Sequence, residues 1–246
     1  MRTVTAVLGG LAIVCAVLPG CTFSAGVNST PTVSKDALRE DIAGRLTKAG
    51  EQPESVTCEE DLVGEVGEKT RCEVVMSPTN SFEPVVTVTG IDGSTIKYEM
   101  TPALSKGQLE KAVSPLVSDA EGVQIDSATC ESGLEGEAGA VAYCDLNAGE
   151  VQLRRMVKVN NVEGLMMNFE VVPVLTQAQV ESSLLDELER QVGQRPDSAD
   201  CSGDLEGKPG NTVDCTIVSG PETTSFTLTV DTVEGNTINY HYEQSS

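Results

Sequence analysis

The sequence has no tryptophan, four tyrosines, four phenylalanines and one histidine among its 246 residues. Aromatic side chains supply much of the stacking surface of sugar-binding and base-binding sites, so their scarcity makes both kinds of site less favoured. The lone His241 leaves few ways to build a nucleophile–base pair or a histidine-containing metal centre. It lies between two tyrosines in the last predicted strand, and we interpret it as a surface residue.

Basic residues are also scarce. The chain has 16 Lys and Arg against 38 Asp and Glu, a formal net charge of −22 at pH 7. Such a chain is repelled by nucleic acid and by anionic lipid headgroups. We therefore expect no nucleic-acid partner and only a covalent attachment to a membrane. The charge leaves cation binding or a basic partner open, although a solvated surface is the simpler interpretation.

The one long apolar run follows Arg2 and extends from Val4 to Leu18. It is too short to be a secure membrane span and is typical of a signal peptide, predicted over 1–20. The run ends at Cys21 in Leu-Pro-Gly-Cys, which resembles a bacterial lipobox: cleavage falls after Gly20, and Cys21 carries a diacylglyceryl group. An ordinary secretory signal is the alternative, and it would leave Cys21 as an odd thiol.

Residues 21–33 then form the predicted lipidated N-terminus and a flexible linker, because small polar residues dominate there. Cys15 leaves with the signal peptide, so six cysteines remain for the folded part. They lie in one pattern, Cys-x3-Leu-x-Gly-x2-Gly-x4-Cys, that occurs three times. Its copies begin at Cys58, Cys130 and Cys201, and this nearly constant interval indicates an internal repeat. The predicted modules are 34–102, 103–174 and 175–246.

Pairing within each copy is the only simple scheme that uses the same bond three times. The predicted disulfides are Cys58–Cys72, Cys130–Cys144 and Cys201–Cys215. Closing a loop of about 15 residues is worth roughly 3 kcal/mol in the chain-entropy model, and a domain of about 70 residues needs such support. A redox centre would normally show Cys-x-x-Cys, and a structural zinc site needs four close ligands. Neither pattern is present in the sequence.

Each repeat begins with a predicted helix and continues with four predicted strands. Leu38, Ile42 and Leu46 form one apolar stripe behind the predicted N-cap Ser34. Similar stripes follow in the other copies, where Pro115 should kink or shorten the second helix. Alternating apolar residues then indicate half-buried strands. The predicted fold class is α+β: three repeated α-β-β-β-β modules, each an antiparallel sheet with one helix packed on it and one internal disulfide.

The loop between the paired cysteines holds two glycines and several acidic residues. The glycines could cradle an anion, but no Lys-Ser/Thr follows and no helix begins there, so turn conformation is the favoured role. The acidic positions differ between copies, and Lys208 replaces an acid in the third, which favours a solvated loop over a calcium site. Met166 and Met167 are interpreted as core residues. We predict no catalytic residue, cofactor or metal ligand.

The anchors of the first repeat together resemble a known family. They are Val56, Cys58, Asp61, Leu62, Gly64, Gly67, Cys72, Val86-Thr87-Val88 and Tyr98. The pattern is similar to a domain of unknown function that is common in actinobacterial, including mycobacterial, lipoproteins and membrane-anchored proteins. The third repeat keeps the tyrosine as Tyr240, and the second has Phe169 instead. The resemblance implies an envelope location and one disulfide per domain, and it brings no known activity.

These observations predict a non-enzymatic interaction or scaffold protein on the extracytoplasmic face of the cell membrane. It would be anchored through diacylglyceryl-Cys21 and would contact an envelope protein or a cell-wall partner, because repeats build extended binding faces. The alternative is a carrier of a small ligand or a cation in a groove between repeats.

Overall fold

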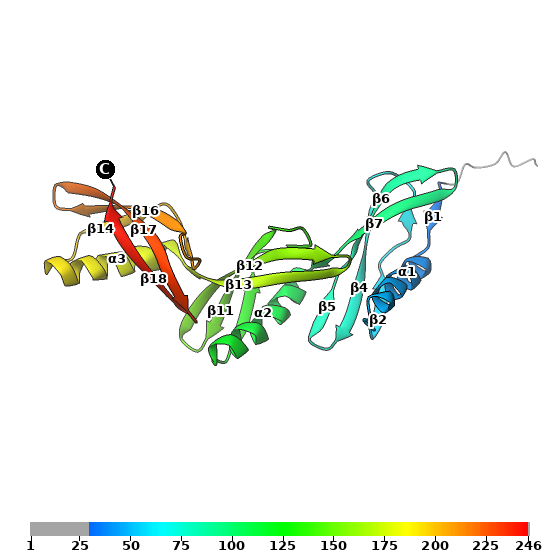
Figure 1. Ribbon diagram of the computed structural model, residues 1–246, viewed down its shortest axis with the longest axis horizontal. Coiled ribbons are helices and arrows are strands. Elements are labelled where there is room, and N and C mark those ends of the chain that lie inside the picture. The colour runs from blue at the N-terminus through cyan, green and yellow to red at the C-terminus, as the bar shows by residue number, and fades with distance from the viewer. Residues whose placement is uncertain (1–29, 246) are drawn as a thin grey trace, which may run out of the picture. The chain divides into compact units, whose positions relative to one another are not determined.

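The computed structural model describes residues 30–245, in which a compact folded unit begins at Pro31. Each of the three repeats contributes one helix and one larger antiparallel sheet (Figure 1). The predicted mixed α+β class, its repetition and its three disulfides are confirmed. The predicted signal peptide, Gly20 and Cys21 lie outside the described residues.

Module 1 contains one helix, α1 (Lys35–Lys48). Its strands are β1 (Thr32–Val33), β2 (Ser55–Cys58), β3 (Leu62–Val63), β4 (Lys69–Ser77), β5 (Asn80–Phe82), β6 (Val85–Asp92) and β7 (Thr95–Thr101). The strand order of its sheet is β2-β4-β6-β7, with β5 paired to β4 and β1 paired to β3.

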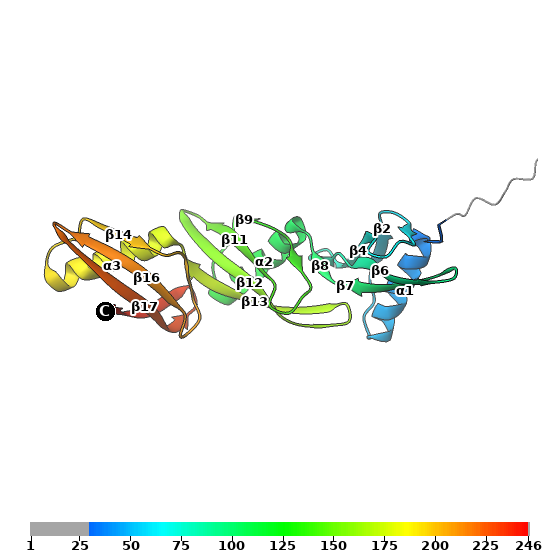
Figure 2. The same ribbon diagram turned by 90° about the horizontal axis from the view of Figure 1, so that it is seen from above.

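Modules 2 and 3 repeat this plan with longer strands. The elements of module 2 are β8 (Ala103–Leu104), α2 (Lys106–Glu121), β9 (Ser127–Cys130), β10 (Leu134–Glu135), β11 (Val141–Ala148), β12 (Val151–Glu163) and β13 (Met166–Leu175). Those of module 3 are α3 (Gln177–Val192), β14 (Ser198–Cys201), β15 (Leu205–Glu206), β16 (Thr212–Ser219), β17 (Glu222–Glu234) and β18 (Thr237–Gln244). The sheet orders are β15-β13-β12-β11-β9 and β14-β16-β17-β18; Figure 2 shows β16 and β17 of the latter from above.

The predicted four-strand pattern therefore fits loosely. Four strands in each module carry the sheet, but additional two-residue strands pair beside it. In module 1 the third predicted strand lies within β6 and the separate strand β5 precedes it, whereas β12 and β17 of modules 2 and 3 are single long strands.

Helix starts follow the sequence signals. The side chains of Ser34, Ser105 and Thr176 accept hydrogen bonds from the backbone of the first turn of their helices. In α2 and α3 a glutamine three residues after the cap completes a capping box. Pro115 does not shorten α2, which has 16 residues, the same number as α3. Buried residues on both sides of Pro115 pack against the sheet and hold the two halves in one helix.

Each module has its own core between helix and sheet. In module 1 the buried stripe of Leu38, Ile42 and Leu46 packs with the Cys58–Cys72 disulfide. Equivalent clusters surround the other two disulfides. Every core is thus closed by one helix face, one sheet face and one disulfide, as the apolar periodicity predicts.

One continuous strand, β13, joins modules 2 and 3, whereas Pro102 separates β7 from β8 between modules 1 and 2. The last two residues of β13 pair with β15 of module 3, in the way that β8 pairs with β10 and β1 pairs with β3. Each small strand pair begins just after a proline, and these prolines recur at a constant interval as Pro31, Pro102 and Pro173. This corrects the predicted linker, since Thr32–Val33 at its end form β1 of the folded unit.

Candidate functional site

The three predicted disulfides are structural staples. Each joins residues directly opposite one another on neighbouring antiparallel strands, for example Cys58 of β2 and Cys72 of β4. All six cysteines of these disulfides are buried. A buried bond inside a packed core fits stabilisation of a small domain rather than redox exchange, which needs an accessible sulfur.

The two loop glycines have different roles. The second, Gly67, has a φ of 93°, and its counterparts Gly139 and Gly210 have a φ of 88°, so a turn conformation was the correct prediction for it. At the first, Gly64, a close contact rather than a turn conformation requires glycine. A Cβ atom there would lie 2.7 Å from the carbonyl oxygen of Pro31, to which the Gly64 amide donates a hydrogen bond. The Gly67 amide donates to Val88. Both amides have protein partners, which disfavours an anion-binding loop.

Two of the loop acids hold the helix starts, a role that sequence reasoning missed. Asp61 accepts a hydrogen bond from the amide of Lys35, and Asp204 accepts one from Gln177. Each of these amides belongs to the first residue of its helix, where amides have no partner within the helix.

Among residues 30–245, no three His, Cys, Asp or Glu side chains gather in an arrangement that could hold a metal ion. Nor does any helix in this range have the length and apolar character needed to cross a membrane.

The methionine pair lies at the junction of modules 1 and 2. Leu165, in the turn between β12 and β13, is buried in the core of module 1, and Met166 beside it is 43% exposed. The interpretation of Met166 as a core residue was therefore wrong. The turn borders two adjoining cavities of about 210 and 300 Å³. The larger one is lined mainly by apolar side chains, including Met76, Phe82 and Phe169.

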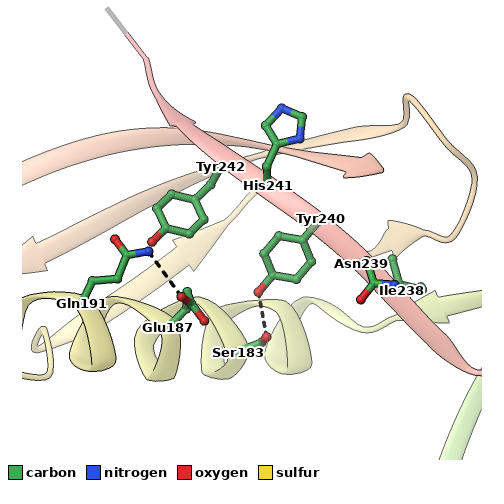
Figure 3. Close-up of a pocket in the computed structure, with 8 residues that line it drawn as sticks. All are labelled: Ser183, Glu187, Gln191, Ile238, Asn239, Tyr240, His241 and Tyr242. Atoms are coloured by element: carbon green, nitrogen blue, oxygen red, sulfur yellow. Dashed lines mark hydrogen bonds between the residues drawn. The ribbon is translucent and has the colours of Figure 1, made fainter. Parts of the chain in front are cut away.

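A larger and more polar groove lies in module 3, between α3 and β18. It has a volume of about 580 Å³ (Figure 3). It is lined by Ser183, Glu187 and Gln191 of α3 and by Ile238, Asn239, Tyr240, His241 and Tyr242 of β18. Half of the four tyrosines in the chain thus line one groove.

The tyrosines of this groove point toward the helix, and His241 points away from it (Figure 3). The Tyr240 hydroxyl lies 2.7 Å from the Ser183 hydroxyl. Tyr242 packs edge-on against Phe226, with ring centroids 5.7 Å apart. The Tyr242 hydroxyl is buried and, within residues 30–245, has no hydrogen-bond partner. Burial raises the pKa of both tyrosines, so both hydroxyls are neutral at pH 7.

His241 stands on the opposite face of β18, half-exposed, with its Nδ1 atom 2.7 Å from Asp231. The prediction that His241 is a surface residue is therefore confirmed. Ser183 is the only serine, threonine or cysteine that lines the groove, and β18 separates its hydroxyl from the His241 ring.

The backbone of β18 has one unpaired edge. No other strand among the described residues pairs with β18 on the side away from β17. The Ser245 amide donates to the carbonyl of Ser225, which makes these opposed residues a hydrogen-bonded pair. Because hydrogen-bonded and non-hydrogen-bonded pairs alternate, the amides and carbonyls of Tyr240, Tyr242 and Gln244 point outward. These groups and the groove beside them form one surface, which we name the β18 edge.

The fold and its sites define a tandem array of small disulfide-stapled α+β modules. The chain belongs to the family described as Domain of unknown function (DUF4333), whose model matches residues 16–93, 95–164 and 165–235. The first match begins ahead of Cys21. The second and third begin close to the starts of β7 and β13, the closing strands of the preceding modules. The chain matches no curated protein and no solved structure in these comparisons.

Proposed function

We propose that this protein is a non-enzymatic, lipid-anchored component of the cell envelope that binds a partner by strand addition at the β18 edge. In strand addition an extended segment joins the open edge of a sheet through backbone hydrogen bonds, while neighbouring pockets select its side chains. The observation that carries the proposal is the outward row of amides and carbonyls on Tyr240, Tyr242 and Gln244, next to an open groove.

The location is part of the proposal. Three buried disulfides suit an oxidising compartment outside the cytoplasm. The predicted diacylglyceryl anchor at Cys21 lies shortly before Pro31, where the folded unit begins. Mass spectrometry of the native protein tests this part. The proposal requires a mature N-terminus at Cys21 with the mass of a lipid modification.

The protein itself supplies a precedent for the binding mode. β15 of module 3 pairs with the outer edge of β13, the closing strand of module 2. β18 is the closing strand of module 3, and nothing described occupies its edge. The β18 edge also lacks lysine and proline, the residues with which many proteins block an exposed edge.

Site-specific photo-crosslinking in the full chain on native membranes tests strand addition. A photoreactive residue at Asn239 should give a product whose crosslink maps to an extended segment of the bound protein. The matched control is Lys97, which occupies the same position in β7 of module 1. Gln244→Pro should abolish the product, because it removes an outward amide without breaking the ladder with β17. Equal products from Asn239 and Lys97 would contradict the proposal.

A specific observation also supports the carrier alternative. The cavity of about 300 Å³ between modules 1 and 2 has the apolar, methionine-containing lining of an adaptable lipid-binding site. Native mass spectrometry of the purified chain with added phospholipid tests it. Retention of lipid by wild type, and loss of that retention in Phe82→Asp, is the result that this alternative requires.

A further inference from the structure

The sequence of β18 is nearly symmetric about His241. It reads Asn239-Tyr240-His241-Tyr242-Glu243, with a tyrosine on each side of the histidine and a polar residue beyond each tyrosine. Two such strands placed antiparallel around a two-fold axis at His241 would set Tyr240 of each strand opposite Tyr242 of the other. Those residues carry outward backbone groups, so each such pair would exchange two hydrogen bonds.

We propose that the strand received by the β18 edge is β18 of a second copy of this chain, in this two-fold register. The inference rests on the strand addition proposed above and names its partner. A two-fold contact is self-complementary, so one surface serves both copies and the assembly closes as a dimer.

The side chains that meet in this register are compatible. On the exposed face His241 would lie beside its own copy, and Asn239 would lie beside Glu243, with an amide donor facing a carboxylate. No two acidic residues are directly opposed. On the helix side, the partner's tyrosines would enter the open groove of about 580 Å³, where the Tyr242 hydroxyl has no partner among the described residues.

The other two modules explain why only the third can pair in this way. The residues equivalent to His241, one and two repeats earlier, are Glu170 in β13 and Glu99 in β7. The same two-fold register on either strand would place two carboxylates directly opposite each other, which destabilises strand pairing. The single histidine of the chain therefore stands at the position where modules 1 and 2 carry a charge that opposes self-pairing.

The net charge of −22 works against self-association at long range. Repulsion between two acidic copies is screened by salt, over a Debye length of about 10 Å at 0.1 M. The dimer should therefore tighten as salt rises. A basic partner would show the opposite dependence, because its attraction to an acidic chain would be screened.

A cysteine substitution at the axis tests the register. In His241→Cys the two introduced thiols would face each other across a non-hydrogen-bonded pair, the same placement as the chain's own Cys58–Cys72 disulfide. The full chain, purified from membranes in detergent, should give a disulfide-linked dimer on a non-reducing gel, and peptide mapping should place the new bond between the two introduced cysteines. Glu99→Cys, at the equivalent position of module 1, should remain monomeric.

Charge at the axis supplies the second test. Wild type in detergent should sediment as a dimer, more completely at about 0.5 M than at 0.05 M salt. His241→Glu, which copies modules 1 and 2, should weaken dimerisation at least tenfold. A monomeric wild type, or a His241→Cys variant whose introduced thiols form no bond with each other, overturns the dimer.

The photo-crosslinking experiment separates the two proposals. An Asn239 crosslink to the same chain supports both. A crosslink to an extended segment of a different protein supports strand addition and overturns self-pairing. No product above the Lys97 control overturns both.

Discussion

Tyr98 donates a 2.9 Å hydrogen bond to the carboxylate of Asp41, which joins the closing strand of module 1 to its helix. Burial, and then this bond, raise the pKa of Tyr98 to about 12. Burial opposes ionisation of Asp41, but hydrogen bonds from Arg45 and Tyr98 outweigh it and lower the pKa of that carboxyl below its usual 3.8. The pair is therefore a neutral donor and a charged acceptor at pH 7.

The first prediction concerns this pair. A carboxyl with a lowered folded-state pKa contributes stability above its unfolded pKa, and this contribution is lost as pH falls through the folded pKa. Asp41→Asn should therefore flatten the acid limb of the stability profile below about pH 4. At pH 7, Tyr98→Phe should cost about 1 kcal/mol, because the bond is partly exposed. Urea unfolding of the full chain from pH 7 to about 2.5 measures both effects. Equal losses from Tyr98→Phe in the wild-type and Asp41→Asn backgrounds would show that the bond contributes nothing.

The second prediction concerns the close approach at the first loop glycine. Gly64→Ala should destabilise module 1 by about 2 kcal/mol or more, because the new methyl group would collide with the Pro31 carbonyl at 2.7 Å. Gly44→Ala is the matched control. It lies inside α1 with no atom within 4 Å of an added Cβ, so it should stabilise by about 0.5–1 kcal/mol. Thermal unfolding of the two variants should shift in opposite directions. A stable Gly64→Ala would mean that Pro31 is not held against the loop.

Much of this fold can be predicted from the sequence because the determinants are local and repeated. Each helix is predicted by one apolar stripe, which in the first helix consists of Leu38, Ile42 and Leu46, and the cysteine spacing predicts the disulfides. Sequence reasoning missed the role of Gly64, which must be glycine because it lies against Pro31. Pro31 precedes the first helix in the sequence and Gly64 follows it, so the contact is not local. The constant interval between Pro31, Pro102 and Pro173 was the available signal.

The candidate site was less accessible to sequence reasoning. The groove beside β18 needs the register of β17 and β18 and the position of α3, neither of which follows from composition. His241 was correctly predicted to lie on a strand surface. The proposal that it permits pairing of two β18 strands depends on comparison with Glu99 and Glu170 in the other closing strands. The incorrect prediction that Met166 is a core residue has a related cause. Apolar residues in the turn of one module can contact the neighbouring module, and the sequence of a single repeat does not show such contacts.

The third prediction concerns the contact between modules 1 and 2. Leu165 belongs to module 2 by sequence, yet its side chain is only 8% exposed in the core of module 1. Leu165→Ala should cost about 2–4 kcal/mol and should lower the unfolding temperature of module 1 as well as module 2. Met166→Ala, at the adjacent and more exposed position, should cost under about 1 kcal/mol. Hydrogen exchange of α1 amides resolves the point. Unchanged protection of α1 in Leu165→Ala would mean that the modules are stabilised independently.

The last prediction concerns a buried charge at the junction of modules 2 and 3. Arg155 has a side chain only 2% exposed, and its guanidinium lies 2.5 Å from the Glu121 carboxylate, itself 12% exposed. The same guanidinium donates to the Asn236 side-chain oxygen in the turn between β17 and β18, at 2.8 Å. One buried cation thus binds the end of α2 to the hairpin of the next module.

Removing one partner of such a pair leaves an uncompensated buried charge, which costs about 3–5 kcal/mol. Arg155→Met should therefore be strongly destabilising, because the largely covered Glu121 side chain would lose its cation. Arg155→Met combined with Glu121→Leu should recover most of the loss, since a buried ion pair can be replaced by apolar residues of similar volume at little cost. Asn236→Ala keeps the ion pair but removes the link to module 3. It should split one calorimetric transition into two by releasing module 3 from module 2. A double variant as unstable as Arg155→Met alone would show that the pair specifies the junction and is not replaceable by packing.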